Sequence, residues 1–169
     1  MRHFYIKQRI FSIGDKYNIY DENENLCYKA TKEIFTLTSK LHIFDEKKQK
    51  EIFFIRKKYF TFLPQYEMYK DENLVASVIK RFTFFSHKID ITSDYGDFEV
   101  LGDFMSHDFE INYNSKKVAS VHKRWLSFGD AYEITINDDS KVDFYIALVI
   151  MIDNCIHNES SATNHHHNN

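Results

Sequence analysis

Apolar and polar side chains alternate along this chain in short segments that return at regular intervals. The clearest of these segments read KYNIYD, KLHIFD, QYEMYK, DFEINYN and AYEITIN. Alternation with a period of two is typical of β-strands that bury one face. Stretches rich in Asn, Asp and Ser, such as NEN, KDEN and NSK, separate them and favour tight turns. The pattern therefore predicts an antiparallel sheet built from hairpins.

The hairpins belong to an internal repeat. The motif Ser-x-Gly-Asp-x-Tyr-x-Ile occurs at residues 12–19 and again at 127–134. A second match, VASVIKRF at 75–82 and VASVHKRW at 118–125, supports the repeat independently. Six units of about 21–25 residues fill the chain to about Asp139. Each unit predicts a long strand, a tight step and a short strand, so we expect twelve strands within residues 4–139.

The segment after the repeat has a different pattern. Residues 142–157 read VDFYIALVIMIDNCIH, and Phe144–Ile152 contains only apolar residues. Its β-branched residues would allow a central strand, but its length and its place after the strands favour a helix. A helix without a polar face must be buried on all sides. It is too short to span a membrane, which takes roughly 17–25 apolar residues.

A closed barrel of twelve strands has room for this helix. Strands ~4.8 Å apart and tilted by ~40° close at a backbone diameter of roughly 24 Å, which leaves a bore of about 12 Å. A helix with its side chains is ~10–12 Å across. A propeller of four-stranded blades would also repeat every 43 residues or so, but only three blades would fit, where four to eight are usual.

The predicted fold class is therefore mainly β: a closed twelve-stranded antiparallel barrel of six hairpin repeats around a central hydrophobic C-terminal helix. We expect residues 1–157 to form this single domain, with the strands in 4–139 and the helix in 142–157. Residues 158–169 form a polar tail rich in His and Asn, which we expect to be disordered.

The net charge and the cysteines narrow the classes of partner and the cellular compartment that the sequence favours. Lys and Arg number 22 against 25 Asp and Glu, which gives a net charge of −3. A domain built to grip nucleic acid usually has a basic excess, so no nucleic-acid partner is expected. The two cysteines, Cys27 and Cys155, form no C-x-x-C pair, and the N-terminus has no apolar signal segment. A reduced, cytoplasmic protein without a cofactor is the expectation.

Basic residues recur in register with the repeat. Arg9, Lys58, Arg81 and Arg124 each precede the first alternating apolar residue of a short strand by eight positions. Equivalent positions in successive hairpins lie ~10 Å apart around a barrel wall, so these cations could cradle a phosphate or an anionic headgroup. The candidate anion- or lipid-binding residues are Arg9, Lys57, Lys58, Lys80, Arg81, Lys123 and Arg124. The alternative is a solvated outer wall, because Glu33 and Asp103 interrupt the series.

A calcium loop is not supported. Asp21, Asn23 and Asn25 have the 1, 3, 5 spacing of an EF-hand, but Leu26 replaces the required Gly and Lys32 replaces the final Glu. We interpret this stretch as a hairpin turn.

Metal binding and catalysis have little support elsewhere in the chain. Three of the nine His, residues 165–167, lie in the polar tail, while His87 and His107 occupy equivalent steps of the repeat. Asp143 and Asp153 bracket the apolar helix, which we interpret as helix ends that emerge at the two barrel mouths. No nucleophile elbow, H-E-x-x-H or Gly-rich phosphate loop is present. We therefore expect neither a metal site nor an enzyme.

Several segments resemble a known family. The opening MRHFYIKQRIFSIGDKYNIYDE, the central FTFLPQYEMY, KRFTFF and GDFMSHDFEI, and the closing KRWLSFGDAYEI with the helix after it are similar to the LURP-one-related family of the Tubby-like superfamily, which also holds the phospholipid scramblases. The resemblance covers residues 1–156 and implies a twelve-stranded barrel around a C-terminal helix. It implies little about activity: bacterial and plant members of the family are largely uncharacterised, while Tubby proteins bind phosphoinositide headgroups and scramblases act on membranes. No motif here matches the Tubby lipid-binding residues, so none is transferred.

Three functions follow as hypotheses. The first is a non-enzymatic barrel that binds an anionic lipid headgroup or lipid-like ligand, in the cytoplasm or at the periphery of a membrane. The second is a protein-interaction scaffold that uses the aromatic-rich wall. The third is a scramblase-like membrane activity, which the missing spanning helix and calcium loop weaken.

Overall fold

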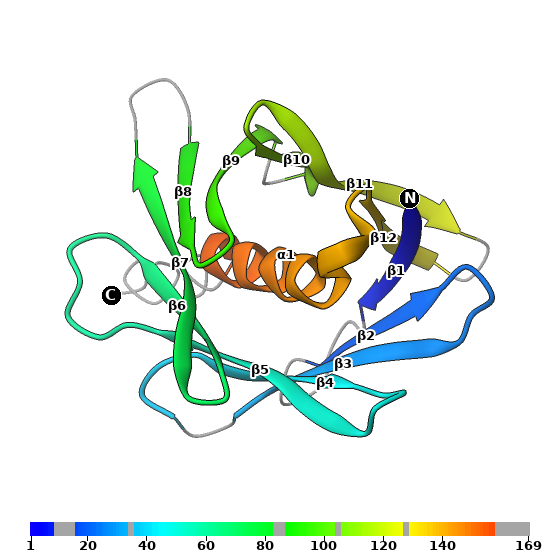
Figure 1. Ribbon diagram of the computed structural model, residues 1–169, viewed down its shortest axis with the longest axis horizontal. Helices are drawn as coiled ribbons and strands as arrows, with labels where there is room; N and C mark the ends of the chain where they lie inside the picture. Colours follow the sequence, from blue (N-terminus) through cyan, green and yellow to red (C-terminus); the bar gives the residue numbers. More distant parts are fainter. Residues whose placement is uncertain (9–15, 34–35, 83–86, 104–105, 127–128, 158–169) are drawn as a thin grey trace, which may run out of the picture.

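A computed structural model describes residues 1–8, 16–33, 36–82, 87–103, 106–126 and 129–157. Twelve antiparallel strands form one closed barrel, and a single long helix lies inside it (Figure 1). The barrel and its central helix are confirmed, and the propeller alternative is wrong. The predicted tail, 158–169, lies outside the described residues.

The elements follow the repeat in order. They are β1 (Arg2–Gln8), β2 (Lys16–Asp21), β3 (Leu26–Lys32), β4 (Lys40–Asp45), β5 (Lys50–Lys57), β6 (Gln65–Lys70), β7 (Asn73–Phe82), β8 (His87–Ser93), β9 (Gly96–Asp103), β10 (Asp108–Tyr113), β11 (Lys116–Leu126), β12 (Gly129–Ile136), the 3-10 helix η1 (Asp139–Lys141) and α1 (Val142–His157).

Each strand pairs with the next one along the chain, and the first and last strands close the ring. Arg2 lies opposite Ile136, and the register of β1 and β12 continues to Lys7 opposite Ala131. Because every neighbour is antiparallel, the connections alternate between the two ends of the barrel. We call the end that carries the β1–β2, β3–β4, β5–β6, β7–β8, β9–β10 and β11–β12 connections the hairpin mouth, and the opposite end the turn mouth.

Bulges shift the register in four strand pairs at related places. They lie between Ile19 and Tyr20, between Ile43 and Phe44, between Met68 and Tyr69, and between Ile111 and Asn112. Each stands near the turn-mouth end of a short strand. A bulge sharpens the local right-handed twist and bends the strand, which helps a sheet to close.

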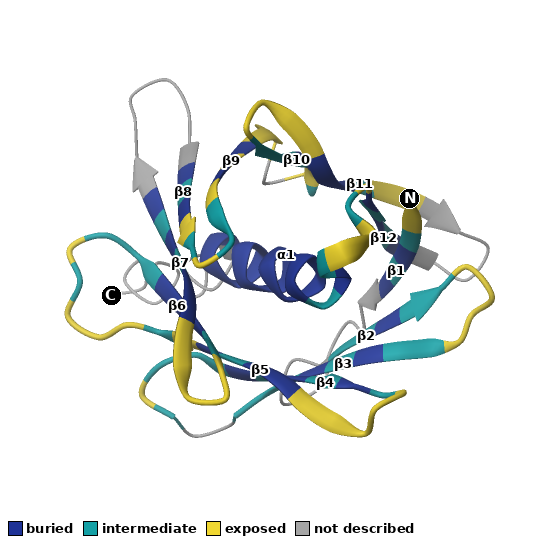
Figure 2. Ribbon diagram, in the orientation of Figure 1, coloured by how far each residue is buried: buried dark blue, intermediate teal, exposed yellow. Residues whose placement is uncertain are grey.

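The core is the helix together with the inward face of the wall. Ile146, Leu148 and Ile150 are completely buried, and Figure 2 shows α1 buried along its length. Inward residues such as Ile43 and Ile55 meet the helix from the strands. At ~1.5–3 kcal/mol for each large apolar side chain removed from water, the helix is a major source of stability.

Polar groups hold the N-terminal end of α1 in place. The Asp138 carboxylate accepts hydrogen bonds from the Ser140 backbone N–H at 3.0 Å and from the Tyr145 hydroxyl at 3.0 Å. Asp143 accepts from the Tyr28 hydroxyl at 2.7 Å and from Lys48 Nζ at 2.9 Å. Burial, and then the bond to Asp143, raise the pKa of Tyr28 far above its usual range. Residues of the wall at the turn mouth therefore hold the N-terminal end of α1.

We expect Leu148→Ala to destabilise the barrel strongly, because it removes a side chain that the wall encloses on all sides. The free energy of unfolding should fall by about 2–5 kcal/mol. The control is Leu101→Ala on β9, where the side chain is exposed and the change should stay within about 0.5 kcal/mol. Urea unfolding followed by fluorescence measures both, and equal effects would contradict a buried helix.

Candidate functional site: a basic barrel mouth

The candidate cations lie at strand ends beside the hairpin mouth. Lys57 ends β5, Lys58 follows it, Lys80 and Arg81 lie near the end of β7, and Lys123 and Arg124 lie near the end of β11. Arg9 lies outside the described residues. Arg81 is placed by its backbone, opposite Lys88 of β8, while its side chain is outside the description.

The β5–β6 connection, residues 58–64, projects from the wall on the side where α1 ends (Figure 1). Phe60 and Phe62 on this connection are fully exposed, at 105% and 102% of their reference areas. Phe60 also has a φ of 53°, a left-handed conformation that a bulky residue rarely adopts. Two aromatic rings in water on one short connection are unusual for a surface that has no binding partner.

A neighbouring connection adds a third apolar tip. Leu37, between β3 and β4, is 94% exposed. The Lys57 backbone N–H donates to the Ser39 carbonyl at 2.8 Å, so the two connections lie side by side. On the other side, the Lys80 backbone N–H donates to the Pro64 carbonyl at 3.0 Å. Apolar tips and basic residues therefore share one sector of the hairpin mouth.

Lys80 does not lie on the outer wall. It lies on the same face of β7 as Ala76 and Val78, both of which face the core, and only 8% of it is exposed. A lysine in such a position runs its apolar stem along the interior towards the mouth. The solvated-wall alternative therefore does not describe Lys80, whereas Arg124 and Lys123 are exposed as that alternative expects.

A buried carboxylate sits beneath the basic residues of β5. Glu67 on β6 is bonded by Arg56 Nε at 3.1 Å and by the Tyr69 hydroxyl at 2.7 Å. Lys58 Nζ approaches the other oxygen of Glu67 at 3.4 Å. Burial alone would raise the pKa of Glu67, but these three partners outweigh it and leave the pKa below the usual 4.5. Two cations thus share one carboxylate, which leaves a local positive excess.

The same arrangement recurs on the far side of the barrel. Arg124 Nε donates to Glu133 at 2.5 Å, and Glu133 is almost fully buried, as Glu67 is. Arg124 and Glu133 are equivalent to Lys58 and Glu67 in the repeat. Two hairpins lie between them in each direction around the ring, so the two pairs lie on opposite sides of the closed wall. The candidate cations therefore form a β5–β7 group and a β11 group around the mouth. Glu67 and Glu133 were not singled out from the sequence, although their constant spacing from the cations was visible.

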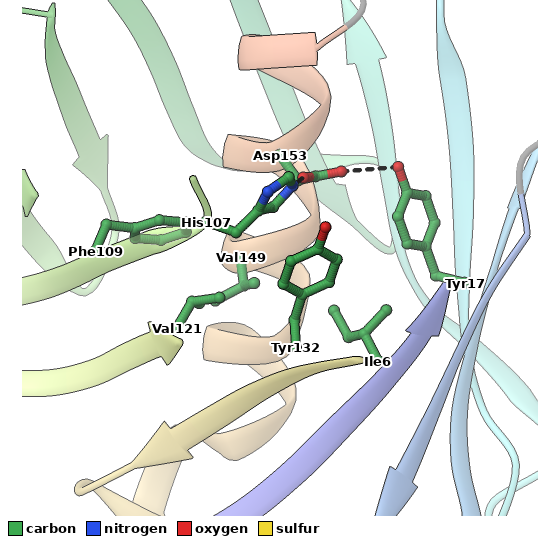
Figure 3. A pocket seen from close by; sticks show the side chains of 8 residues that line it. All are labelled: Ile6, Tyr17, His107, Phe109, Val121, Tyr132, Val149 and Asp153. Carbon is green, nitrogen blue, oxygen red and sulfur yellow. Dashed lines mark hydrogen bonds and ion pairs between the residues drawn. The ribbon is translucent and has the colours of Figure 1, made fainter. Parts of the chain in front are cut away.

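A polar network lies where α1 reaches the hairpin mouth (Figure 3). The Asp153 carboxylate accepts from the Tyr17 hydroxyl at 2.9 Å and meets His107 Nε2 at 2.8 Å. The His107 ring stacks on Tyr132 with the centroids 4.1 Å apart. The cavity beside this network is about 10 Å³, the size of a single water, and too small for a ligand.

The network changes the interpretation of two sequence positions. His107 was expected only as a turn step of the repeat and Asp153 only as a helix end. The structure joins them across 46 residues. The one signal in the sequence is physical: a carboxylate on an otherwise apolar helix needs a partner.

The described residues offer neither a metal site nor a membrane-spanning helix. No group of three or more His, Cys, Asp or Glu side chains is arranged to hold a metal ion there. The one α-helix in the described ranges is not long and apolar enough to cross a membrane.

Comparisons with known proteins agree with the fold. The model of the LURP-one-related family matches residues 2–153. The uncharacterised protein YxjI of Bacillus subtilis is 30% identical over 159 residues, which cover 94% of this chain and 96% of YxjI. An X-ray structure of an Arabidopsis thaliana protein is similar with a TM-score of 0.57 and 15% identity, over 90% of this chain and 91% of that one. That structural likeness concerns the fold alone.

We expect Asp153→Asn to destabilise the protein, because an amide is a weaker acceptor for Tyr17 and His107 than a carboxylate. The loss should be about 1–3 kcal/mol, measured by urea unfolding at neutral pH. Asp97→Asn, an exposed residue of β9, is the control and should leave the unfolding midpoint in place. An unchanged midpoint in both variants would mean that the network contributes nothing to the closed mouth.

Glu67 also predicts a pH dependence. Because its pKa is lowered in the folded protein, it stabilises the fold above the usual value of 4.5, and this contribution disappears as the pH falls through the lower folded pKa. Glu67→Gln should therefore be less stable than the wild type at pH ~7, and the two should converge below pH ~4. Unfolding free energies across this range test the prediction, with Glu99→Gln on β9 as a control that keeps the wild-type profile. A difference in unfolding free energy between the wild type and Glu67→Gln that stays the same at every pH would contradict the prediction.

Proposed function

This chain belongs to the LURP-one-related family, and with its apolar and basic hairpin mouth as the starting point we propose that it binds anionic phospholipid at a membrane surface. The observation that carries the proposal is the full exposure of Phe60 and Phe62 on the connection that begins at Lys58, the residue after Lys57. Aromatic rings that insert between lipids, with cations at the headgroup level, are the usual composition of an interfacial anchor.

The apolar contribution comes from the tips. Burying a Phe side chain completely is worth roughly 1.5–3 kcal/mol, and partial insertion at the interface yields a fraction of this. Leu37 lies on the adjacent connection and would enter the same leaflet. Because the barrel interior is filled by α1, the tips have no internal cavity to fold into. Insertion into a lipid leaflet would remove them from water.

The electrostatic contribution comes from the strand ends below the tips. Each Lys or Arg close to an anionic surface adds about 1 kcal/mol, and the effect fades within a Debye length of ~10 Å. Lys57 and Lys58 precede Phe60 by three and two residues. The β11 group, Lys123 and Arg124, would reach the same surface when the whole mouth faces it. Arg9 and Arg81 remain predicted members of this surface.

The strength of membrane binding follows from the apolar and electrostatic contributions. Two or three apolar tips and a few cations sum to a gross gain of about 5 kcal/mol, which corresponds to weak, reversible association. The net charge of −3 opposes approach from any other direction. Attachment through the hairpin mouth would therefore depend on anionic lipid and on ionic strength.

Liposome flotation tests the proposal. The wild type should float with vesicles of phosphatidylcholine that contain about one third phosphatidylserine, should float poorly with pure phosphatidylcholine, and should lose binding as salt rises. Phe60→Ser/Phe62→Ser should lower the partition coefficient at least roughly tenfold. Lys57→Gln/Lys58→Gln should lower it for the anionic vesicles alone.

Matched controls separate this mouth from the rest of the surface. Leu74→Ser removes an exposed apolar side chain near the turn mouth, and Lys47→Gln/Lys50→Gln removes two exposed cations at the turn mouth. Both controls should float like the wild type. The proposal is wrong if the wild type floats with neither kind of vesicle at low salt. It is also wrong if the control variants lose as much binding as the mouth variants.

A further inference from the structure

A groove of about 600 Å³ runs along the outer wall of β4, β5 and β6, away from the apolar tips. Its floor is apolar and includes Ile52, Phe53 and Phe54, and Tyr69 borders it. At this size the groove is much larger than a single ammonium group and fits several residues of an extended chain. Neither the barrel closure nor the proposed membrane contact uses it.

An aromatic row crosses the groove from strand to strand. His42 lies opposite Phe54 and Phe54 lies opposite Tyr69, so the three rings stand in one cross-strand line. Their centroids are 5.0 Å and 6.2 Å apart. At the end of the row, the guanidinium carbon of Arg56 lies 4.7 Å above the Tyr69 ring. The wall therefore already stacks one guanidinium group of its own on this row.

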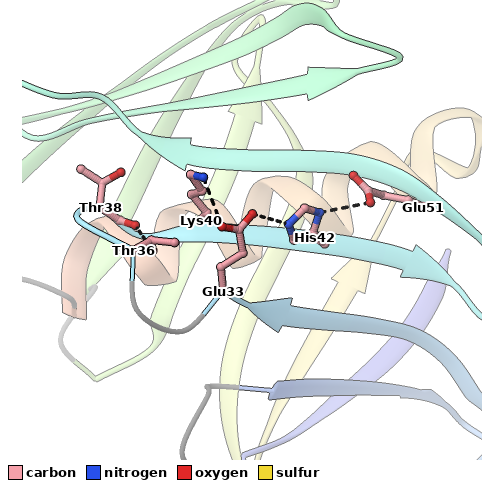
Figure 4. Close-up of polar contacts among 6 residues, drawn as sticks. All are labelled: Glu33, Thr36, Thr38, Lys40, His42 and Glu51. Atoms are coloured by element: carbon pink, nitrogen blue, oxygen red, sulfur yellow. Dashed lines mark hydrogen bonds and ion pairs between the residues drawn. The ribbon is translucent and has the colours of Figure 1, made fainter.

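Carboxylates surround the aromatic floor. His42 lies between two of them, with Nε2 2.9 Å from Glu33 and Nδ1 3.1 Å from Glu51 (Figure 4). Hydrogen bonds from His42 and then from Lys40 lower the pKa of Glu33, so it is ionised at neutral pH. The remaining two, Asp71 and Glu72, are exposed on the β6–β7 turn at the end of the groove.

The charges of the groove are unequal. Its lining carries four carboxylates, from Glu33, Glu51, Asp71 and Glu72, against the single guanidinium of Arg56. Lys40 and His42 already pair with Glu33, so the excess of negative charge is greatest at Asp71 and Glu72. This favours a cationic occupant that can also present a flat surface to the aromatic row. A guanidinium group does both, since it stacks on aromatic faces and forms paired hydrogen bonds with carboxylates, whereas an ammonium group is a hydrated point charge.

We propose that this groove binds an arginine-rich, extended segment of a protein partner. The partner's arginines would stack on Phe54 and the open part of the aromatic row, and pair with Asp71 and Glu72 at the turn. This proposal does not rest on the membrane contact, because it involves other residues of β5 and β6 and the opposite sign of charge. The two proposals can fail separately.

Fluorescence anisotropy with a labelled octa-arginine peptide at low salt tests the proposal, with octa-lysine as the comparison. Octa-arginine should bind more tightly than octa-lysine. Asp71→Asn/Glu72→Gln should weaken octa-arginine binding roughly tenfold, as expected for the loss of two charge-assisted contacts. The control Asp97→Asn/Glu99→Gln makes the same change of charge on β9, far from the groove, and should bind like the wild type.

A second variant tests the aromatic row. Phe54→Leu keeps the apolar volume but removes the π face, so it should reduce the preference for arginine over lysine while leaving the unfolding midpoint close to that of the wild type. Equal binding of both peptides by the wild type would overturn the proposal, and so would equal losses in the groove and control variants. Displacement of the peptide by choline alone would assign the groove to an ammonium ligand instead. Self-association that competes with the peptide would assign it to a second copy of this chain.

Discussion

The apolar helix and the wall around it depend on each other. Without the wall, α1 would expose large side chains on every face, and without α1 the wall would enclose an empty bore of roughly 12 Å. The pairing of β1 with β12 completes the enclosure, so strands from opposite ends of the repeat must meet before the helix is fully covered. Every surface discussed above is held in place by this closed arrangement.

Much of this architecture could be predicted from the sequence because its signals are local. Period-two alternation identifies strands, and a run such as Phe144–Ile152 identifies a helix that must be buried. The repeat supplied the number of strands, and the dimensions of sheet and helix then left little choice of fold. No long-range information was needed for these steps.

The candidate surfaces could be predicted only in part, because they depend on register and on contacts between distant residues. The series of cations was visible in the sequence, but the inward position of Lys80 follows from the pairing of β7. The aromatic row exists because register places His42, Phe54 and Tyr69 side by side. His107 and Asp153 meet through the fold, and no local pattern joins them.

A ring of twelve strands has a further consequence for recognition. Throughout the described strands, every strand has a hydrogen-bonded neighbour on both sides, so the wall presents no open backbone edge to another chain. Along these described strands, a partner that recognises a protein by adding a β-strand to its sheet finds no free edge. Selectivity must then come from side chains alone, and surface substitutions could redirect it without disturbing the hydrogen-bonded ring.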